Sequence, residues 1–173
     1  DEAGERVPPN TVGQIIMRGA GNMVEYWNNP EETARTIKDG WLYSGDLGKL
    51  DEDGLLTFVD RMKDLIISGG LNIAAAEVER AVLSSGQPIQ ECLVIAAKDS
   101  KFGETPLAVV YATGDVDVAA LIAHCNEQLA DYKVPRYVAI EHEPMPRTAT
   151  GKLSKPPLRE KYADAPNILE RVR

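Results

Sequence analysis

The clearest chemical feature of the sequence is a lysine within PRTATGKLSK, residues 146–155. Lys152 follows a Thr-Gly pair, which is typical of loops that hold phosphate. The stretch is not a P-loop, because that motif needs a glycine five positions before Gly151 and a serine or threonine after the lysine, whereas Pro146 and Leu153 occupy those places. Two interpretations remain for Lys152 by itself. It is a solvated lysine, or it is a cation on a flexible loop that can meet a developing negative charge.

Three further groups of residues suit the binding of a nucleotide. Asp46 follows a Ser-Gly turn in YSGDLG, residues 43–48, where its carboxylate could accept hydrogen bonds from both hydroxyls of a ribose. Arg61 offers a planar, permanently charged donor for a sugar hydroxyl or a phosphate. Gly69 and Gly70 leave the backbone open to close approach by a ligand. Each group taken alone also fits an ordinary polar turn, so both readings stay open for each.

Other polar residues point to structure rather than chemistry. Glu77 and Glu79 are expected on the solvated face of a helix, and no chemistry can be assigned to Gly103-Glu104. Cys92 and Cys125 lie in apolar patterns without metal-ligand spacing, so we expect buried, reduced thiols. The two histidines also lack partner spacing, and the sequence predicts no metal site.

The composition is that of a globular protein with an acidic surface. The 173 residues are 43% hydrophobic and 27% charged, with a net charge of −8. That balance argues against a nucleic-acid or anionic-membrane binder, which would carry a basic face. There is no apolar run long enough for a transmembrane helix and no recognisable signal peptide, so we expect a cytoplasmic protein. The chain starts at Asp1 inside a loop-like stretch, which suggests a piece of a longer protein.

The predicted elements divide the chain near residue 61. The first part contains a strand at 13–20, a helix starting with Asn29 and Pro30, and two strands around a turn at Gly54. That is too few strands for a complete domain. The sequence of the second part predicts an α+β domain with a small sheet and two main helices. We expect strands in 64–70 and at 91–98, 107–113 and 137–142, main helices at 74–85 and 117–135, and a short helix at 158–162.

The order of the motifs is more specific than any one of them. Tyr-Ser-Gly-Asp precedes Arg-x-Lys-Asp-x-Ile, Gly-Gly-x-Asn-Ile and a Glu-Val-Glu helix, and Pro-Arg-Thr-x-Thr-Gly-Lys follows about 80 residues later. This series resembles the adenylate-forming superfamily, which includes acyl-CoA synthetases, adenylation domains of peptide synthetases and firefly luciferases. The resemblance covers the whole chain. It implies that residues 1–61 are the mostly-β C-terminal end of the large AMP-binding domain, and that residues 62–173 are the small, mobile, mixed-sheet C-terminal domain with flanking helices.

The resemblance also implies a role for each candidate residue. Members of the family join a carboxylic acid to ATP as an acyl-adenylate, then rotate the small domain so that a thiol, usually that of CoA, displaces AMP. Asp46 and Arg61 match the residues at the ribose of ATP and AMP, and Lys63 matches the hinge. Lys152 matches the lysine that enters the site for adenylation. Gly69 and Gly70 match the loop that lines the pantetheine tunnel in the second step.

The implied protein is an AMP-forming acyl-CoA synthetase, an acid-thiol ligase for a fatty or aryl acid. Its cofactors would be ATP, CoA and Mg²⁺, with Mg²⁺ bound by the N-terminal domain that this chain lacks, so the chain alone is expected to be inactive. A lysine acetyltransferase and deacetylase could control Lys152, because acetylation removes its charge. The alternatives are an adenylation domain of a peptide synthetase and a non-catalytic docking or regulatory module.

Five positions, in three places, depart from the usual family pattern. Asp60 stands where glycine is common before the arginine. Residues 74–76 are alanines where relatives carry bulkier residues or a proline, and Phe102 replaces a tryptophan before Gly-Glu.

Overall fold

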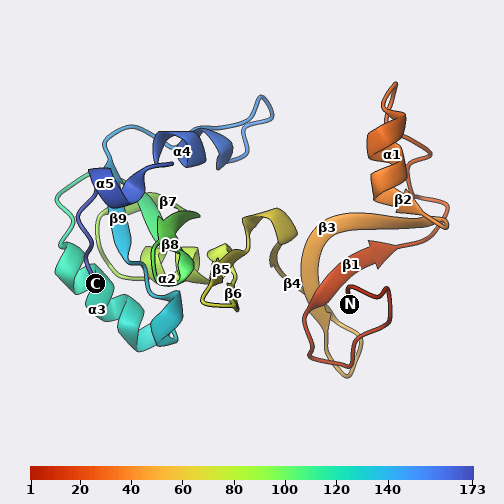
Figure 1. The fold of residues 1–173 in the computed structure, drawn as a ribbon, viewed down its shortest axis with the longest axis horizontal. Coiled ribbons are helices and arrows are strands. Elements are labelled where there is room, and N and C mark those ends of the chain that lie inside the picture. The colour runs from red at the N-terminus through yellow and green to blue at the C-terminus, as the bar shows by residue number, and fades with distance from the viewer. The chain divides into compact units, whose positions relative to one another are not determined.

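The computed structural model describes residues 1–173 and contains two compact units, an N-terminal unit of Asp1–Lys63 and a C-terminal unit of Asp64–Arg173 (Figure 1). The boundary lies two residues after the one expected at Arg61. Each unit contains its own β-sheet.

The N-terminal unit is built on a four-stranded antiparallel sheet. Its long strand β3 (Trp41–Leu50) pairs with all three of the others, which are β1 (Gly13–Met17), β2 (Ile37–Lys38) and β4 (Leu56–Arg61). Helix α1 (Pro30–Thr36) begins where the sequence predicts. The side chain of Asn29 accepts a hydrogen bond from Glu32 N at 3.1 Å, and Pro30 occupies the first helical position, where its missing N–H costs nothing.

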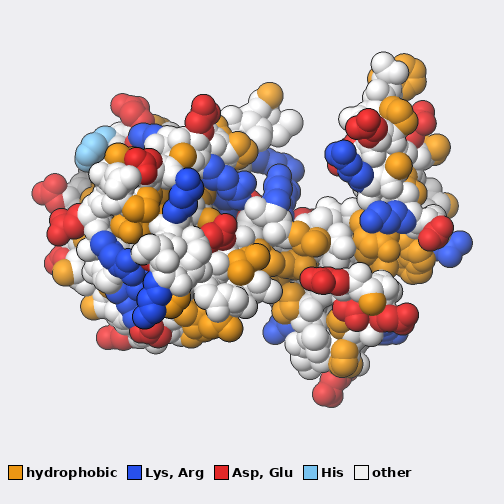
Figure 2. Space-filling model, in the orientation of Figure 1, with side chains coloured by type: hydrophobic (Ala, Val, Ile, Leu, Met, Phe, Trp, Pro, Cys, Tyr) orange, Lys and Arg blue, Asp and Glu red, His pale blue; other side chains and the backbone are white.

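The N-terminal unit buries little apolar surface. Leu47 is its only large hydrophobic side chain that is buried. A groove of about 650 Å³ runs beside β1 and β3, and Figure 2 shows hydrophobic side chains on the surface of this unit. Large exposed apolar patches mark surfaces that other protein covers. The exposed hydrophobic side chains of this unit are Val12, Met17, Val24, Tyr26, Trp27, Trp41, Leu50, Leu55, Leu56, Phe58 and Met62.

The C-terminal unit contains a five-stranded mixed sheet. Four strands run in the order β6-β5-β8-β7, and the fifth strand, β9, pairs in parallel with β8. Their bounds are β5 (Ile66–Ser68), β6 (Leu71–Ile73), β7 (Ile89–Asp99), β8 (Gly103–Ala112) and β9 (Tyr137–Glu141). The predicted α+β class with a mixed sheet is confirmed.

Helices cover both faces of this sheet (Figure 1). Helices α2 (Ala75–Leu83) and α3 (Val118–Gln128) lie on one face, and α4 (Pro156–Lys161) and α5 (Ala165–Ile168) on the other. Two short 3-10 turns, η1 (Met62–Asp64) and η2 (Asp131–Lys133), complete the chain. None of the helices has the length and apolar character needed to cross a bilayer.

The two-sided cover explains the continuous apolar runs at residues 92–97 of β7 and 106–112 of β8. Successive side chains of a strand point to opposite faces. Val94 and Val110 therefore pack with the α2–α3 face, while Ile95 and Val109 pack beneath α4 and α5. Full burial of each such side chain is worth about 1.5–3 kcal/mol, so this double core stabilises the unit by itself.

Two elements differ from the sequence-based expectation. Helix α3 ends at Gln128 rather than near residue 135, because Leu129 adopts an extended backbone, with φ −122° and ψ 152°. Strand β6 lies between the predicted strand in 64–70 and the predicted helix at 74–85, where the sequence predicts no strand. Gly69 and Gly70 form the two-residue turn of a β5–β6 hairpin, and their positive φ angles of +57° and +83° suit a tight hairpin turn of this kind.

Candidate functional site

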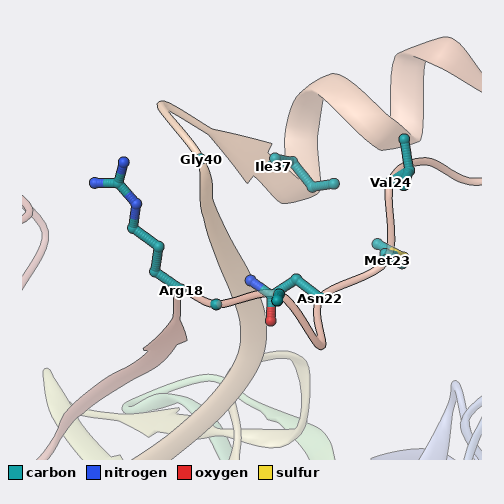
Figure 3. Close-up of a pocket in the computed structure, with 8 residues that line it drawn as sticks. Arg18, Asn22, Met23, Val24, Ile37 and Gly40 are labelled. Atoms are coloured by element: carbon teal, nitrogen blue, oxygen red, sulfur yellow. The ribbon is translucent and has the colours of Figure 1, made fainter.

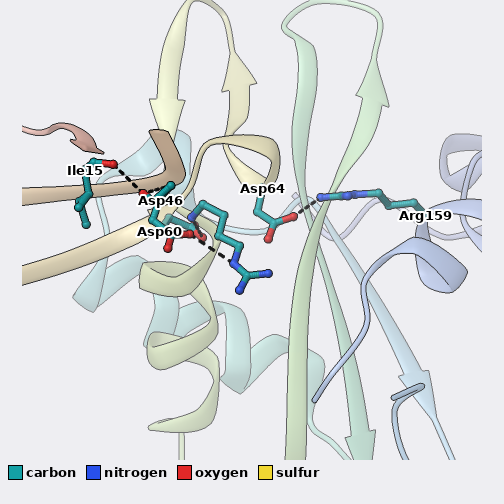
Figure 4. Close-up of polar contacts among 7 residues, drawn as sticks. Ile15, Asp46, Asp60, Asp64 and Arg159 are labelled. Atoms are coloured by element: carbon teal, nitrogen blue, oxygen red, sulfur yellow. Dashed lines mark hydrogen bonds and ion pairs between the residues drawn. The ribbon is translucent and has the colours of Figure 1, made fainter. Parts of the chain in front are cut away.

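Asp46 and Arg61 lie opposite each other on neighbouring strands of the N-terminal unit. They are paired positions of β3 and β4, and Arg61 Nε lies 3.5 Å from Asp46 Oδ1 (Figure 4). The Arg61 and Asp46 side chains are 52% and 35% exposed, so the ion pair adds little stability. A carboxylate acceptor and a planar donor are thus brought together where a polar ligand can reach them.

Hydrogen bonds fix the backbone on both sides of this pair. Ser44 Oγ donates to Ile15 O at 2.7 Å and accepts from Asp46 N at 3.0 Å. The buried carboxylate of Asp60 accepts from Arg61 N at 2.7 Å. The departure at position 60 therefore has a structural role, because the aspartate holds the amide of the arginine beside it.

Lys63 lies in η1 and is the last residue of the N-terminal unit. Asp64, the first residue of the C-terminal unit, is anchored within its own unit, since Asp64 Oδ1 lies 2.5 Å from Arg159 Nη2 (Figure 4). The expected hinge residue thus coincides with the boundary between the two units in the chain. That a rotation occurs there stays a prediction.

The β5–β6 hairpin is held against the start of β8. Gly69 N donates to Phe102 O at 2.8 Å, and Ile67 N donates to Glu104 Oε2 at 2.9 Å. A Cβ on Gly69 would lie 3.2 Å from the Phe102 ring, whereas a Cβ on Gly70 would meet nothing within 4 Å. Glu104, to which the sequence assigned no chemistry, therefore fixes the hairpin, and the Gly70 end of its turn stays open.

Lys152 lies on a second hairpin, residues 146–154, which we call the Lys152 hairpin. Thr148 N donates to Lys152 O at 2.8 Å, and Gly151 N donates to Thr148 O at 2.9 Å. Ser154 N closes the base on Pro146 O at 2.8 Å. These bonds satisfy the backbone locally and close the turn, so the predicted loop is a hydrogen-bonded hairpin, and its flexibility stays a prediction. The side chain of Lys152 is exposed.

Two carboxylates of the C-terminal unit hold the ends of the Lys152 hairpin. Glu91 pairs with Arg147, and Glu79 Oε1 lies 2.9 Å from Lys155 Nζ. The expectation of a solvated Glu79 was wrong, since its side chain is only 19% exposed. Glu77 is 36% exposed, and its carboxylate binds Lys133 Nζ at 2.7 Å. These partners lie far apart in the sequence. The sequence contained one signal for such a pair, the carboxylate of Glu91 at the start of an apolar strand, because an acid that becomes buried there needs a partner.

Neither cysteine can serve as a nucleophile. Cys92 and Cys125 are free and buried, as predicted. Burial raises the pKa of Cys92 well above its usual value and that of Cys125 to about 11, so both thiols are protonated near neutral pH. No three His, Cys, Asp or Glu side chains are grouped as a metal site would require.

A shallow pocket of about 410 Å³ also opens in the N-terminal unit (Figure 3). It lies between Arg18, Asn22, Met23, Val24, Ile37 and Gly40. None of the predicted site residues lines this pocket or the groove beside β1 and β3. Within the N-terminal unit the structure thus pairs Asp46 with Arg61, and within the C-terminal unit it sets Gly69-Gly70 and Lys152 on two separate hairpins.

Proteins with similar sequences include CoA ligases. The chain is 43% identical over 170 residues to a long-chain-fatty-acid–CoA ligase of Bacillus subtilis, covering 97% of this chain and 30% of that protein. It is 41% identical over 160 residues to a 2-succinylbenzoate–CoA ligase of Bacillus thuringiensis, covering 92% of this chain and 33% of that protein. The chain thus spans about a third of the length of these relatives.

Solved structures also match nearly the whole chain. ATP-bound MatB from Rhodopseudomonas palustris matches with a TM-score of 0.86 and 34% identity, over 95% of this chain and 33% of that one. Residues 77–152, which include most of α2 and end at Lys152, match the family of the AMP-binding enzyme C-terminal domain. The chain therefore belongs to the adenylate-forming superfamily and carries its AMP-binding C-terminal domain.

Proposed function

We propose that this chain is part of an AMP-forming acyl-CoA synthetase that activates a fatty or aryl carboxylic acid with ATP and transfers the acyl group to CoA. The observation that carries the proposal is the exposed Lys152 on a closed hairpin, in a chain that also pairs Asp46 with Arg61. The CoA ligase relatives support the reaction class, and their named acids support the substrate class.

In the first half-reaction a carboxylate attacks the α-phosphate of ATP and releases pyrophosphate. The Asp46 carboxylate has two oxygens that can accept from both ribose hydroxyls, and Arg61 lies beside it as a donor. The ammonium of Lys152 stabilises the negative charge that builds on the α-phosphate oxygens. Mg²⁺ is assigned to the part of the enzyme outside this chain.

In the second half-reaction the thiol of CoA displaces AMP from the acyl-adenylate. Rotation at Lys63 withdraws the Lys152 hairpin and brings the β5–β6 hairpin to the site. Gly69 and Gly70 leave room for the pantetheine arm, in keeping with the open space around Gly70. Acetylation of Lys152 would remove the charge needed for the first step, and the exposed amine is accessible for it.

Two alternatives predict different products. An adenylation domain of a peptide synthetase would load a carrier protein rather than CoA, and a non-catalytic module would carry out neither half-reaction. The CoA ligases among the relatives favour CoA as acceptor. Formation of acyl-CoA by the full-length enzyme identifies the synthetase, and pyrophosphate release without acyl-CoA separates an adenylation domain from a non-catalytic module.

The substitution Lys152→Ala in the full-length enzyme tests the central role. With ATP and a panel of octanoate, palmitate, ferulate and 2-succinylbenzoate, pyrophosphate release should fall by about 10²- to 10³-fold, the usual loss for one group that stabilises transition-state charge. The control is the second half-reaction, started from synthetic acyl-adenylate and CoA, which should keep its rate. Pyrophosphate release near the wild-type rate would refute the assignment.

A further inference from the structure

We propose that Arg147 and Lys155, through Glu91 and Glu79, are positioning residues for adenylation, because their two ion pairs hold the Lys152 hairpin at both ends. The inference rests on the proposed function of Lys152. None of the four side chains needs to touch substrate. Their role is to fix the position of the Lys152 Cα atom, from which the catalytic side chain extends.

The first ion pair holds the strand that enters the hairpin. Arg147 Nη2 pairs with Glu91 Oε1 on β7, while Arg147 Nη1 donates to Gly151 O at 2.9 Å. The other oxygen of Glu91 accepts from Met145 N at 2.8 Å. One carboxylate thus ties down the residue before the hairpin, and the guanidinium it binds reaches the turn next to Lys152. Met145 is itself buried in the core beneath α4 and α5.

The second ion pair holds the strand that leaves the hairpin. Lys155 Nζ lies 2.9 Å from Glu79 Oε1 on α2, and the same oxygen accepts from Val94 N at 2.9 Å. The side chains of Lys155 and Glu79 are only 11% and 19% exposed. Loss of either partner would leave the other charge largely buried without compensation, so the pair resists opening.

Between these two ion pairs the backbone of the hairpin has little freedom. Lys152 N donates to Thr148 Oγ1 at 3.2 Å, and Lys152 O accepts from Thr148 N at 2.8 Å. The Cα atom of Lys152 is therefore fixed relative to β7 and α2, and only its side chain stays free to move. Displacing a catalytic group by about 1 Å can lower a rate by about 10²-fold. Ion pairs at the ends of the hairpin can thus control the first half-reaction without contributing chemistry.

The alternative is that the two pairs only stabilise the C-terminal unit. A stabilising role predicts equal losses in both half-reactions, because both depend on a folded unit. A positioning role predicts a selective loss of adenylation, since only that step uses Lys152. Arg147→Ala and Lys155→Ala each leave a carboxylate without its cation, so the ratio of the two half-reaction rates, and not the loss in either one, separates the two ideas.

The experiment uses the full-length enzyme and the acid of the panel above that releases pyrophosphate fastest. For Arg147→Ala we expect the kcat of adenylation to fall by about 10- to 100-fold, with the second half-reaction within about 2-fold of wild type. Arg147→Ala/Lys155→Ala should approach the loss of Lys152→Ala, and Arg147→Lys should recover part of the rate. Lys161→Ala is the matched control, because it breaks an ion pair of 2.6 Å with Glu141 on β9 instead.

The possible results decide between a positioning role and a stabilising role of the two ion pairs. Adenylation within about 2-fold of wild type in Arg147→Ala, or equal losses in both half-reactions, would overturn the inference while leaving Lys152 in its role. Unchanged adenylation in Lys152→Ala would overturn the proposed function instead. If Arg147→Ala fails to fold, Arg147→Lys decides by the same ratio of half-reaction rates, with the thermal midpoint as the check on folding.

Discussion

At the scale of single residues, the shape of the Lys152 hairpin depends on Gly151. Its φ of +83° lies in the left-handed region, and a Cβ there would meet no atom within 4 Å. The requirement for glycine is therefore conformational and does not come from steric crowding. A turn followed by a left-handed glycine is a common way to close a three-residue hairpin loop.

The comparison of Gly151→Ala with Gly151→Asn tests this requirement. Alanine in the left-handed region costs about 1–2 kcal/mol, whereas asparagine visits it readily. In the full-length enzyme we expect Gly151→Ala to slow pyrophosphate release by about 5- to 30-fold. Gly151→Asn should stay closer to wild type, and both should keep the rate from synthetic acyl-adenylate. Equal rates for the two variants would argue against a conformational role.

The residues that carry charge at the surface could be found from the sequence, but their partners could not. The types and order of Asp46, Arg61 and Lys152 were enough to propose a nucleotide site. The pairing of Arg147 with Glu91 spans 56 residues and follows no periodic spacing, so it depends on how β7 lies against the hairpin. The hairpin form of the Lys152 loop could not be predicted for the same reason, because composition does not reveal the hydrogen bonds that close it.

At the scale of elements, the two hairpins of the C-terminal unit are supported in different ways. The Lys152 hairpin has ion pairs at its ends, while the β5–β6 hairpin is short and depends on Glu104 and the Phe102 carbonyl. The sequence predicted the long strands β7 and β8, since both contain a continuous apolar run. It missed β6, because three residues are too few to show an alternation.

Gly70→Leu should affect the second half-reaction more than the first. The substitution strains a backbone at φ +83° and places a side chain in space that is otherwise open. We expect the rate of acyl-CoA formation from synthetic acyl-adenylate to fall by about 10-fold or more, with a smaller effect on pyrophosphate release.

The matched control is Gly86→Leu. Gly86 also has a positive φ, +74°, and a Cβ on it would meet no atom within 4 Å, but it lies between α2 and β7 rather than in the hairpin. This control carries the same kind of strain without the hairpin. Similar losses in the two half-reactions for Gly70→Leu, or the same profile for Gly86→Leu, would count against the tunnel role.

At the scale of the whole molecule, the two units differ in how far they can stand alone. The C-terminal unit has apolar clusters on both faces of its sheet, which is the pattern of an independent domain. The N-terminal unit leaves most of its large apolar side chains exposed. The sequence indicated this difference through the small number of strands before residue 61.

The 173-residue chain by itself should therefore be folded in its C-terminal unit but inactive. We expect a cooperative thermal transition followed by circular dichroism, and the same transition in residues 64–173. With ATP, Mg²⁺ and the panel of acids we expect no pyrophosphate release, because the phosphate and acyl sites are assigned to the rest of the enzyme. Release above background would show that the assignment is wrong. The thermal transition is the control that the chain has folded.

Helix α2 connects the two hairpins through the chain itself. It starts at Ala75, two residues after β6 ends, and four residues later Glu79 holds Lys155. Ala75 and Val78 are fully buried, so the helix cannot shift without disturbing the core. Genetic variants that separate the two half-reactions should consequently lie outside the buried face of α2. A substitution on the buried face would displace both hairpins together and would therefore lower the rates of both half-reactions.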